Sequence, residues 1–241
     1  MTESSASQPF RGSPARTVAI IPALNEEQSI GKVLDALPRD FVDRVYVVDN
    51  GSTDQTAAVA RAHGAEVLYQ PERGYGAACL KGMAHLAPET EFVLFIDGDY
   101  SDFPEESAEL LQPLFDGEVD FVLGSRTLGV SERGSLTLPQ QFGNWLATTL
   151  IRGIWGYPYT DLGPFRAIRR DALDRLNMVD RNYGWTVEMQ IKALQKQLSV
   201  RELPVRYRNR IGDSKVSGTV RGVVGAGTKI LWTIAKYSRE D

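Results

Sequence analysis

The chain is poor in the residues that form disulfide scaffolds and histidine metal sites. Its 241 residues include a single cysteine, Cys79, and two histidines, His63 and His85. A lone cysteine excludes an internal disulfide, which fits a reducing cytoplasm. Two widely spaced histidines are too few for a histidine-based metal centre. We therefore expect a cytoplasmic protein whose functional site depends on other side chains.

Long hydrophobic runs and an excess of basic residues are also absent. No stretch of about 18 apolar residues occurs, so the sequence predicts no transmembrane helix. The 27 basic and 31 acidic residues give a formal net charge of -4, which argues against general nucleic-acid binding. The charge is uneven, because residues 201–241 carry +5 and the preceding 200 residues carry -9. Such a basic end is expected to contact a phosphate or a lipid surface, unless it is simply a solvated face.

Apolar runs alternate with amphipathic segments between residue 17 and about residue 124. This alternation predicts an α/β fold with a mostly parallel central sheet flanked by helices. The expected strands cover 18–22, 45–49, 66–69, 92–96 and 120–123, and the expected helices cover 26–37, 57–63, 77–86 and 104–115.

The second half of the chain is less regular. We predict a mobile polar loop over 127–141, helices over 142–155, 188–195 and 219–237, and a strand over 200–207. Residues 1–16 have the composition of a disordered lead-in. No linker divides the rest, so one domain is expected over 17–217, followed by a basic and apolar helix in 218–241.

The most informative segment is Asp97-Gly98-Asp99, which follows the apolar run Phe92–Ile96. Ligands of open α/β sheets bind at the carboxyl ends of such strands. Two adjacent carboxylates repel each other unless a cation or hydrogen bonds offset the charge. The segment therefore predicts a divalent cation that holds a diphosphate, although a polar turn before the next helix is the alternative.

Two further strands end in polar segments, Pro22–Glu27 and Val48–Asp54. Each contains a possible capping motif, with Asn25 or Ser52 as the cap of the following helix. The alternative is that these strand ends surround a nucleoside, with the Asp49 carboxylate accepting hydrogen bonds from ribose or base. Gly74 and Gly76 belong to a weak dinucleotide-like pattern, and we expect close backbone approach to a nucleotide there.

The order and spacing of these segments resemble the nucleotide-sugar half of a GT-A glycosyltransferase of family 2. The resemblance rests on Pro22–Glu27, Val48–Asp54, Asp97–Asp99 and Gly124–Arg126. Later segments resemble the branch of dolichyl-phosphate mannose synthases and undecaprenyl-phosphate glycosyltransferases: Asn144, Asp161–Arg166, Arg210 and Gly212–Lys215. The resemblance divides the domain into a nucleotide-sugar half, 17–126, and an acceptor half, 127–217.

The resemblance implies an inverting, metal-dependent transfer of a sugar from a UDP- or GDP-sugar, with Mg2+ or Mn2+ as cofactor and a polyprenyl phosphate as the leading acceptor. The implied donor-binding residues are Pro22, Leu24, Glu26, Asp49, Asp97, Gly98 and Arg126. The implied phosphate clamp is Arg210, Ser214 and Lys215, and the implied metal ligands are Asp97, Asp99 and Ser101. Ser101 stands where the branch often has Gln, and Asp102 is a possible substitute.

The acceptor decides whether a catalytic base is needed. A lipid phosphate is already anionic, whereas a hydroxyl acceptor requires a base, for which Asp161 and Glu188 are the candidates. Either carboxylate is as well explained by orienting an arginine. A soluble hydroxyl acceptor therefore remains an alternative, and so does a nucleotide-sugar binding module without turnover.

Two apolar segments are candidates for contact with a membrane, with the domain itself or with a second copy of the chain. Residues 142–155 and 219–237 are expected to lie at a membrane surface, to pack on the domain, or to form a homo-oligomer interface. The sequence leaves these three possibilities open.

Overall fold

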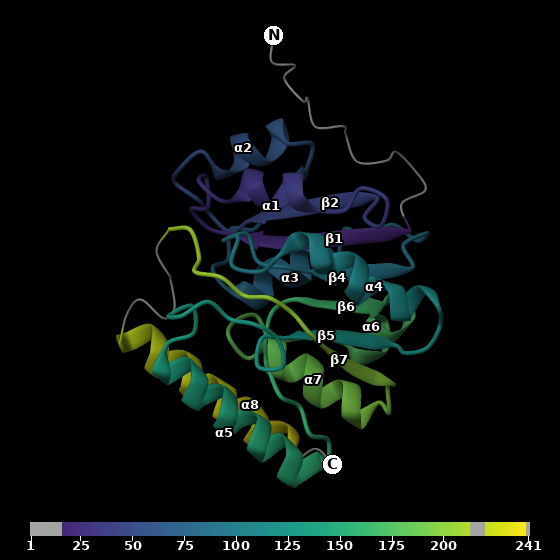
Figure 1. The fold of residues 1–241 in the computed structure, drawn as a ribbon, viewed down its shortest axis with the longest axis vertical. Helices are drawn as coiled ribbons and strands as arrows, with labels where there is room; N and C mark the ends of the chain where they lie inside the picture. Colours follow the sequence, from purple (N-terminus) through teal and green to yellow (C-terminus); the bar gives the residue numbers. More distant parts are fainter. Residues whose placement is uncertain (1–15, 213–219, 240–241) are drawn as a thin grey trace.

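The computed structural model describes residues 16–212 and 220–239, and its centre is a seven-stranded sheet (Figure 1). The strand order is β3-β2-β1-β4-β6-β5-β7. All pairs are parallel except those that β6 forms with β4 and β5. The strands are β1 (Thr17–Ala23), β2 (Arg44–Asp49), β3 (Glu66–Tyr69), β4 (Phe92–Phe95), β5 (Phe121–Ser125), β6 (Arg166–Arg169) and β7 (Val200–Pro204).

Helices cover both faces of the sheet, as the predicted α/β architecture requires. They are α1 (Ile30–Ala36), α2 (Thr56–Ala62), α3 (Tyr75–Met83), α4 (Ser107–Phe115), α5 (Leu138–Trp155), α6 (Arg170–Leu176), α7 (Trp185–Gln195) and α8 (Val220–Tyr237), with a short 3-10 helix at Pro104–Glu106. The chain thus has three layers, and this confirms the mostly parallel sheet flanked by helices.

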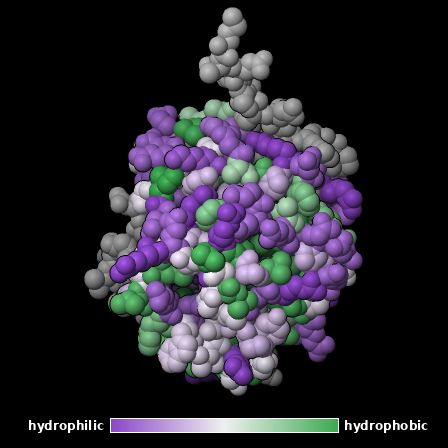
Figure 2. All heavy atoms as spheres, in the orientation of Figure 1, coloured by the Kyte–Doolittle hydropathy of each residue, from purple (hydrophilic) through white to green (hydrophobic). Residues whose placement is uncertain are grey.

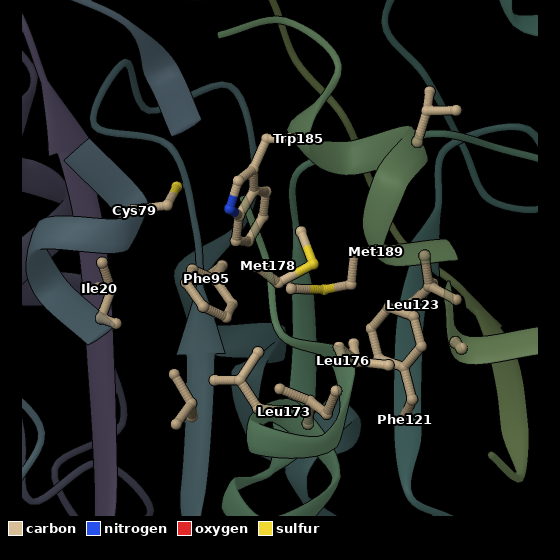
Figure 3. Close-up of a cluster of buried hydrophobic side chains, with 14 of the residues drawn as sticks. Ile20, Cys79, Phe95, Phe121, Leu123, Leu173, Leu176, Met178, Trp185 and Met189 are labelled. Carbon is tan, nitrogen blue, oxygen red and sulfur yellow. The ribbon is translucent and has the colours of Figure 1, made fainter. Parts of the chain in front are cut away.

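Successive side chains of each strand point to opposite faces, which divides the core into two clusters. Val18 and Ile20 of β1 pack on the face covered by α3 and α5 to α8. Ala19 and Ile21 pack on the other face, beneath α1, α2 and α4. Figure 3 shows the first cluster, in which the Trp185 ring lies edge-on to Phe95 at a centroid distance of 4.8 Å.

Several element boundaries differ from the predictions. Helix α1 begins at Ile30 rather than at residue 26, and α5 begins at Leu138, inside the segment predicted to be a loop. Strand β7 ends at Pro204, three residues before the predicted end. Strand β6 and helix α6 were not predicted at all.

Helix α8 packs on the domain in its described part. Ile234 and Tyr237 are 3% and 5% exposed and belong to the first core cluster, together with residues of α5 and α7. In Figure 1, α5 and α8 lie together at one edge of the molecule, at the opposite end from α2. No helix among the described residues is long and apolar enough to span a bilayer.

Candidate functional site

The carboxyl ends of β1, β2 and β4 meet at one edge of the sheet because the three strands are parallel neighbours. Ala23 of β1 pairs with Asp49 of β2, and Ile20 pairs with Phe95 of β4. A pocket of about 550 Å³ opens at this edge. Its lining includes the predicted residues Pro22, Leu24, Glu26, Asp97, Gly98, Asp99 and Arg210.

A second pocket, of about 570 Å³, adjoins the first. Asp97, Asp99 and Arg210 line both pockets, so these three side chains stand at the boundary. Arg126 lines the second pocket, together with residues of α5 and α8. The arrangement suits two ligands that meet at the Asp97–Asp99 segment.

Asp99 is a buried carboxylate that is held by three donors. The backbone N of Ser101 donates to Asp99 Oδ1 at 2.9 Å, and the Ser101 hydroxyl donates to the same oxygen at 2.6 Å. Arg210 Nη1 lies 3.2 Å from Asp99 Oδ2. Ser101 is itself 1% exposed and lines neither pocket, and in the structure its side chain supports Asp99.

Asp97 has a buried carboxylate oxygen that the protein leaves unsatisfied in its described part. Among the residues that the structure describes, none donates a hydrogen bond to its buried Oδ1, although the residue lines both pockets. Burial, together with the negative charge of Asp99, raises the pKa of Asp97 to about 7. A cation beside Asp97 and Asp99 would satisfy this oxygen and offset the repulsion, so the two carboxylates fit a divalent ion.

Other metal ligands are scarce near this pair. Among the residues that the structure describes, no group of three or more Asp, Glu, His or Cys side chains is arranged to hold a metal. Asp102, the possible substitute for Ser101, lines neither pocket. Burial and the charges of Asp97 and Asp99 raise the pKa of Asp102 well above its ordinary value, which favours the neutral acid. A cation bound here would need ligands from a bound molecule.

Arg210 bridges two carboxylates, those of Glu26 and Asp99, at the boundary between the two pockets. Its Nη2 donates to Glu26 Oε1 at 2.9 Å, while Nη1 faces Asp99. Glu26 also accepts a hydrogen bond of 3.0 Å from the Ser29 hydroxyl. Glu26 was predicted to contact a nucleoside. In the structure it lines the first pocket, and its carboxylate is paired with Arg210.

Asp49 does not line either pocket, although it ends β2 as predicted. Its Oδ1 accepts the backbone N–H of Ser52 at 2.8 Å. The next residue, Asn50, lines the first pocket instead, and its Oδ1 accepts the backbone N–H of Gly74 at 2.8 Å. Sequence reasoning missed Asn50, although its place directly after a strand is the signal that identified Asp49.

Asn25 lies in the left-handed region, with φ of 55°, and does not cap α1. Its Oδ1 accepts the backbone N–H of Thr53 at 2.8 Å, and the Ser52 hydroxyl accepts its own N–H at 3.0 Å. The capping interpretation of Asn25 was therefore wrong. The two residues tie the loops after β1 and β2 to each other.

The backbone approach at Gly74 and Gly76 involves the protein itself. A Cβ on Gly76 would lie 2.1 Å from the carbonyl oxygen of Asp180, and one on Gly74 would lie 2.1 Å from that of Arg181. The backbone N of Ala77 donates to the same Arg181 oxygen at 2.8 Å. These glycines allow the segment before α7 to close over the start of α3, where Asn182 and Tyr183 join the pocket lining.

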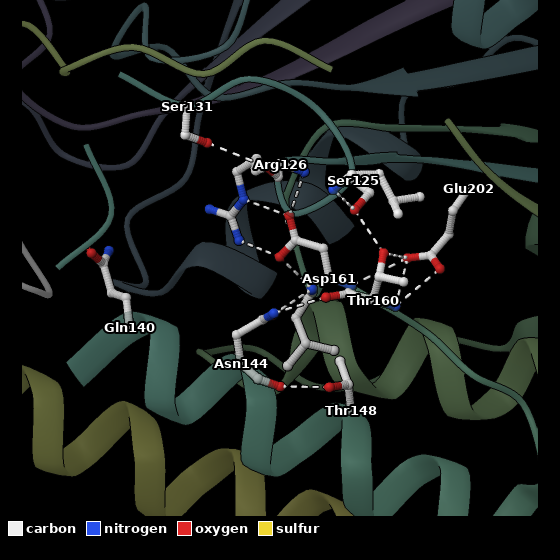
Figure 4. Close-up of polar contacts among 12 residues, drawn as sticks. Ser125, Arg126, Ser131, Gln140, Asn144, Thr148, Thr160, Asp161 and Glu202 are labelled. Atoms are coloured by element: carbon white, nitrogen blue, oxygen red, sulfur yellow. Dashed lines mark hydrogen bonds and ion pairs between the residues drawn. The ribbon is translucent and has the colours of Figure 1, made fainter. Parts of the chain in front are cut away.

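Asp161 and Arg126 form a network on the far side of the second pocket (Figure 4). The Arg126 guanidinium donates to both Asp161 oxygens, and its backbone N donates to Oδ2. Although burial alone would raise it, the pKa of Asp161 is lowered by the charge and hydrogen bonds of Arg126. An ionised carboxylate that is fully engaged in this way is poorly suited to accept a substrate proton, so the structure does not favour Asp161 as a base.

Asn144 of α5 fixes the segment around Asp161. Its Nδ2 donates to the Thr160 carbonyl at 3.0 Å, and its Oδ1 accepts the backbone N–H of Leu162 at 2.9 Å. Glu202 of β7 accepts hydrogen bonds from the backbone N of Thr160 and Asp161 (Figure 4). Sequence reasoning missed Glu202, because a single acid in an alternating strand carries no signal of such a role.

Glu188, which was predicted as a candidate catalytic base, lies outside both pockets in the structure. The carboxylate is 0% exposed and lines none of the pockets described here. It pairs with Lys192 at 2.7 Å and accepts hydrogen bonds from the Tyr237 hydroxyl and the backbone N of Val179 and Asp180. Glu188 therefore joins α7 to α8. The remaining clamp residues of the prediction, Ser214 and Lys215, lie outside the described residues.

Solved structures share this fold. Glucosyl-3-phosphoglycerate synthase from Mycobacterium tuberculosis, in complex with Mn2+, UDP-glucose and phosphoglyceric acid, superposes with a TM-score of 0.75 at 22% identity. The match covers 93% of this chain and 80% of that chain. UDP-glucose and phosphoglyceric acid are ligands of that enzyme. At this identity the similarity shows the GT-A fold.

Sequence relatives are closer. An uncharacterised glycosyltransferase of Mycobacterium tuberculosis is 39% identical over 85% of this chain and 91% of its own length. A dolichyl-phosphate hexose transferase of Haloferax volcanii is 33% identical over 80% of this chain and 82% of its own length. The sequence model of the family described as "Glycosyl transferase family 2" matches residues 18–176, which is more than half of the chain. The chain therefore belongs to glycosyl transferase family 2, and it is a glycosyltransferase with the GT-A fold.

Proposed function

We propose that the enzyme transfers a sugar from a nucleotide-diphosphate donor, a UDP- or GDP-sugar, to a polyprenyl phosphate, with inversion at the anomeric carbon. The donor would occupy the first pocket, at the ends of β1, β2 and β4. The acceptor would occupy the second pocket, beside Arg126. Asp97 and Asp99, which line both pockets, would then lie where the diphosphate and the transferred sugar meet.

A divalent cation belongs to this proposal. Asp97 and Asp99 would hold Mg2+ or Mn2+, and this assignment is supported by the buried Oδ1 of Asp97, which has no hydrogen-bond partner in the described part of the chain. The cation would neutralise the charge that grows on the diphosphate leaving group. Arg210 stands beside Asp99 and would bind the same phosphates by charge-assisted hydrogen bonds.

The charge of the second pocket is the observation that favours a phosphate acceptor over a hydroxyl acceptor. Its described lining includes two cations, Arg126 and Arg210, and its only carboxylates are Asp97 and Asp99, which are assigned to the metal. A hydroxyl acceptor needs a base, but Asp161 is paired with Arg126 and Glu188 lies in another network. A phosphate oxygen is already an anionic nucleophile, and the two arginines would hold it.

The reaction then consists of a single displacement. An oxygen of the acceptor phosphate attacks the anomeric carbon on the face opposite the diphosphate. The bond from this carbon to the diphosphate oxygen breaks, and the nucleoside diphosphate leaves with the electron pair. One displacement inverts the anomeric configuration, and no proton transfer is required.

A transfer assay with matched acceptors tests the proposal. A panel of UDP- and GDP-sugars is incubated with Mn2+ and either a short, water-soluble polyprenyl phosphate or the corresponding polyprenol. We expect one donor to give a polyprenyl phosphosugar and the polyprenol to give no product. Transfer to the alcohol would favour a hydroxyl acceptor, and donor binding without transfer or hydrolysis would favour a binding module.

Two variants make the assay specific to the site. Arg126→Gln should raise the acceptor KM about tenfold or more, because one charge-assisted contact to the phosphate is lost. Asp171→Asn is a matched control, since Asp171 is a solvent-exposed carboxylate on α6 that pairs with Arg169. The control should transfer sugar at the rate of the wild type.

A further inference from the structure

Helices α5 and α8 differ from the rest of the chain in charge. The chain contains 31 acidic residues, yet neither of these 18-residue helices contains Asp or Glu. Their sequences carry only basic charged residues, which are Arg152 in α5 and Arg221, Lys229 and Lys236 in α8. The pair therefore forms a basic element on an acidic protein.

The same two helices expose large apolar side chains. Phe142 and Trp145 of α5 are 61% and 59% exposed, and their ring centroids lie 5.8 Å apart. Trp232 of α8 is 54% exposed. Leu138, Ile154 and Leu231 are exposed as well. Exposed aromatic and aliphatic side chains that gather on two packed helices are typical of interaction surfaces.

The opposite sides of both helices are buried, so the exposed residues face away from the domain. Ala147 and Ile151 of α5, and Ile234 and Tyr237 of α8, belong to the core cluster beside the sheet. Figure 1 places both helices at one edge of the molecule, and in Figure 2 hydrophobic and pale residues are frequent in that region of the visible face. We call the set Leu138, Phe142, Trp145, Leu231 and Trp232 the apolar helix face.

We propose that the apolar helix face docks on the surface of an anionic phospholipid bilayer. Amphipathic helices of this composition lie in the interface with aromatic side chains at the level of the headgroups and cations on the lipid phosphates. Lys229 and Lys236 lie beside the Trp232 ring, at 4.5 and 5.8 Å from its centroid. The protein would lie on the bilayer, and none of its described helices would span it.

Charge favours a bilayer over a second copy of the chain. A two-fold interface brings the same patch of both subunits together, so two acid-free basic surfaces would face each other. Lys229 is paired with Asp180 at 2.8 Å, which leaves Arg152 and Lys236 as the main source of the positive charge. An anionic lipid surface complements these cations, whereas a second copy repels them.

The apolar helix face is continuous with the second pocket. Pro139, Gln140, Gly143 and Asn144 of α5, and Ala226, Gly227 and Ile230 of α8, line that pocket. Docking through these helices would place the pocket opening at the membrane surface. This step rests on the proposed acceptor. The phosphate of a polyprenyl phosphate would reach Arg126 and Arg210 while its polyprenyl chain stays in the bilayer.

Vesicle flotation tests the docking surface without reference to catalysis. The full chain is mixed with vesicles of phosphatidylcholine alone, or of equal parts phosphatidylcholine and phosphatidylglycerol, and the floated protein is measured. We expect flotation with the anionic vesicles only, and a decrease as salt is added. Phe142→Ser with Trp232→Ser should lower binding roughly tenfold or more, because two aromatic anchors are lost. Arg152→Gln should lower it about fivefold, the effect of one cation near the surface.

Matched controls separate docking from folding and from catalysis. Tyr69→Ser removes an aromatic side chain that is 61% exposed on β3, at the other end of the sheet, and should leave flotation unchanged. Neither Phe142 nor Trp232 lines a pocket described here. The double variant should therefore bind the donor and glycosylate a short, soluble polyprenyl phosphate like the wild type. It should fail only with a long-chain acceptor in vesicles.

The outcomes distinguish the two proposals. Flotation by the apolar helix face without any transfer to polyprenyl phosphate would refute the acceptor and leave the docking surface intact. Transfer without flotation, or equal flotation of the double variant, would overturn the docking surface. A dimer in solution that Phe142→Ser and Trp232→Ser dissociate, with no vesicle binding, would assign the same surface to a second copy and also overturn it.

Discussion

Arg126 holds Asp161 through two parallel hydrogen bonds, from Nε to Oδ2 and from Nη2 to Oδ1, each 2.7 Å long. The two side chains are 13% and 3% exposed, so the ion pair is largely withdrawn from water. Because Arg126 also lines the second pocket, Asp161 fixes the direction in which this cation faces that pocket. Asp161 is therefore a positioning residue for Arg126.

Asp161→Asn should destabilise the protein and weaken acceptor binding together. Removing one member of a buried ion pair leaves an uncompensated charge, which costs about 3–5 kcal/mol. We expect the free energy of unfolding to fall by about 3 kcal/mol in urea titration. In a double-mutant cycle with Arg126→Gln, the double variant should lose clearly less than the sum of the single losses. Additive losses would contradict the pairing.

The same ion pair predicts an acid dependence. The pKa of Asp161 is lower in the folded protein than its ordinary value of 3.8, because of Arg126. Its stabilisation is therefore present above that value and is lost as the pH falls through the lower folded pKa. Asp161→Asn should flatten the stability curve at this acid end, as measured by thermal unfolding across pH. An unchanged slope would contradict the assignment.

Asp97 should give the opposite pH dependence in metal-free protein. Its folded pKa of about 7 lies above the ordinary value of 3.8, so the folded state retains a proton that the unfolded state has lost. Stability should fall as the pH rises from about 4 to about 7, and Asp97→Asn should remove this fall. Mn2+ competes with the proton, so its affinity should rise with pH and level off near 7. Calorimetric titration of Mn2+ across pH measures this directly, and a flat affinity would contradict it.

Glu188→Gln tests whether this carboxylate is structural. Glu188 pairs with Lys192 and accepts a 2.7 Å hydrogen bond from the Tyr237 hydroxyl, so the variant loses contacts that hold α7 and α8 together. We expect a loss of about 2–4 kcal/mol in the free energy of unfolding, with kcat of the folded enzyme unchanged. Tyr237→Phe should cost about 1 kcal/mol. A large fall in kcat at wild-type stability would restore Glu188 as a catalytic residue.

Gly76→Ala should disturb the contact between α3 and the segment before α7. The added methyl group would meet the Asp180 carbonyl oxygen at 2.1 Å, so the backbone must shift, at a cost of about 1–3 kcal/mol. Because Asn182 and Tyr183 line the first pocket, donor affinity should also fall. Gly153→Ala in α5 is the control. Apart from its own stretch of helix, no described atom lies within 4 Å of its Cβ position, and the variant should stabilise the helix by about 0.5–1 kcal/mol.

The buried strands were predictable because each contains an uninterrupted apolar run. Strands β1, β2 and β4 are followed by polar residues, and this pattern predicted that Asp97 and Asp99 lie at the carboxyl edge of the sheet. Strand β6 was missed because Arg166–Arg169 is four residues long, has an arginine at each end, and depends on antiparallel neighbours. Such pairing is set by tertiary contacts and leaves no local pattern.

The roles of individual carboxylates were harder to predict than their positions. Asp161, Glu188 and Glu26 all appeared as candidate site residues, yet each has a basic partner: Arg126, Lys192 and Arg210 respectively. The Glu26 partner lies 184 positions away in the chain, so no local pattern reveals the pair. The pair of Glu188 and Lys192 is different, because the two residues lie one helical turn apart. Their spacing in the sequence was therefore a readable signal.

Asp97 and Asp99 are expected to form a metal-dependent donor site. The most direct measurement is thermal unfolding with a panel of UDP- and GDP-sugars, with and without Mn2+, on the wild type, Asp99→Ala and the control Asp171→Asn. We predict that one donor raises the melting temperature only with Mn2+, in the wild type and the control, and that Asp99→Ala abolishes the effect. Stabilisation that persists in Asp99→Ala without metal, or no stabilisation by any donor, would contradict a metal-dependent donor site at these two residues.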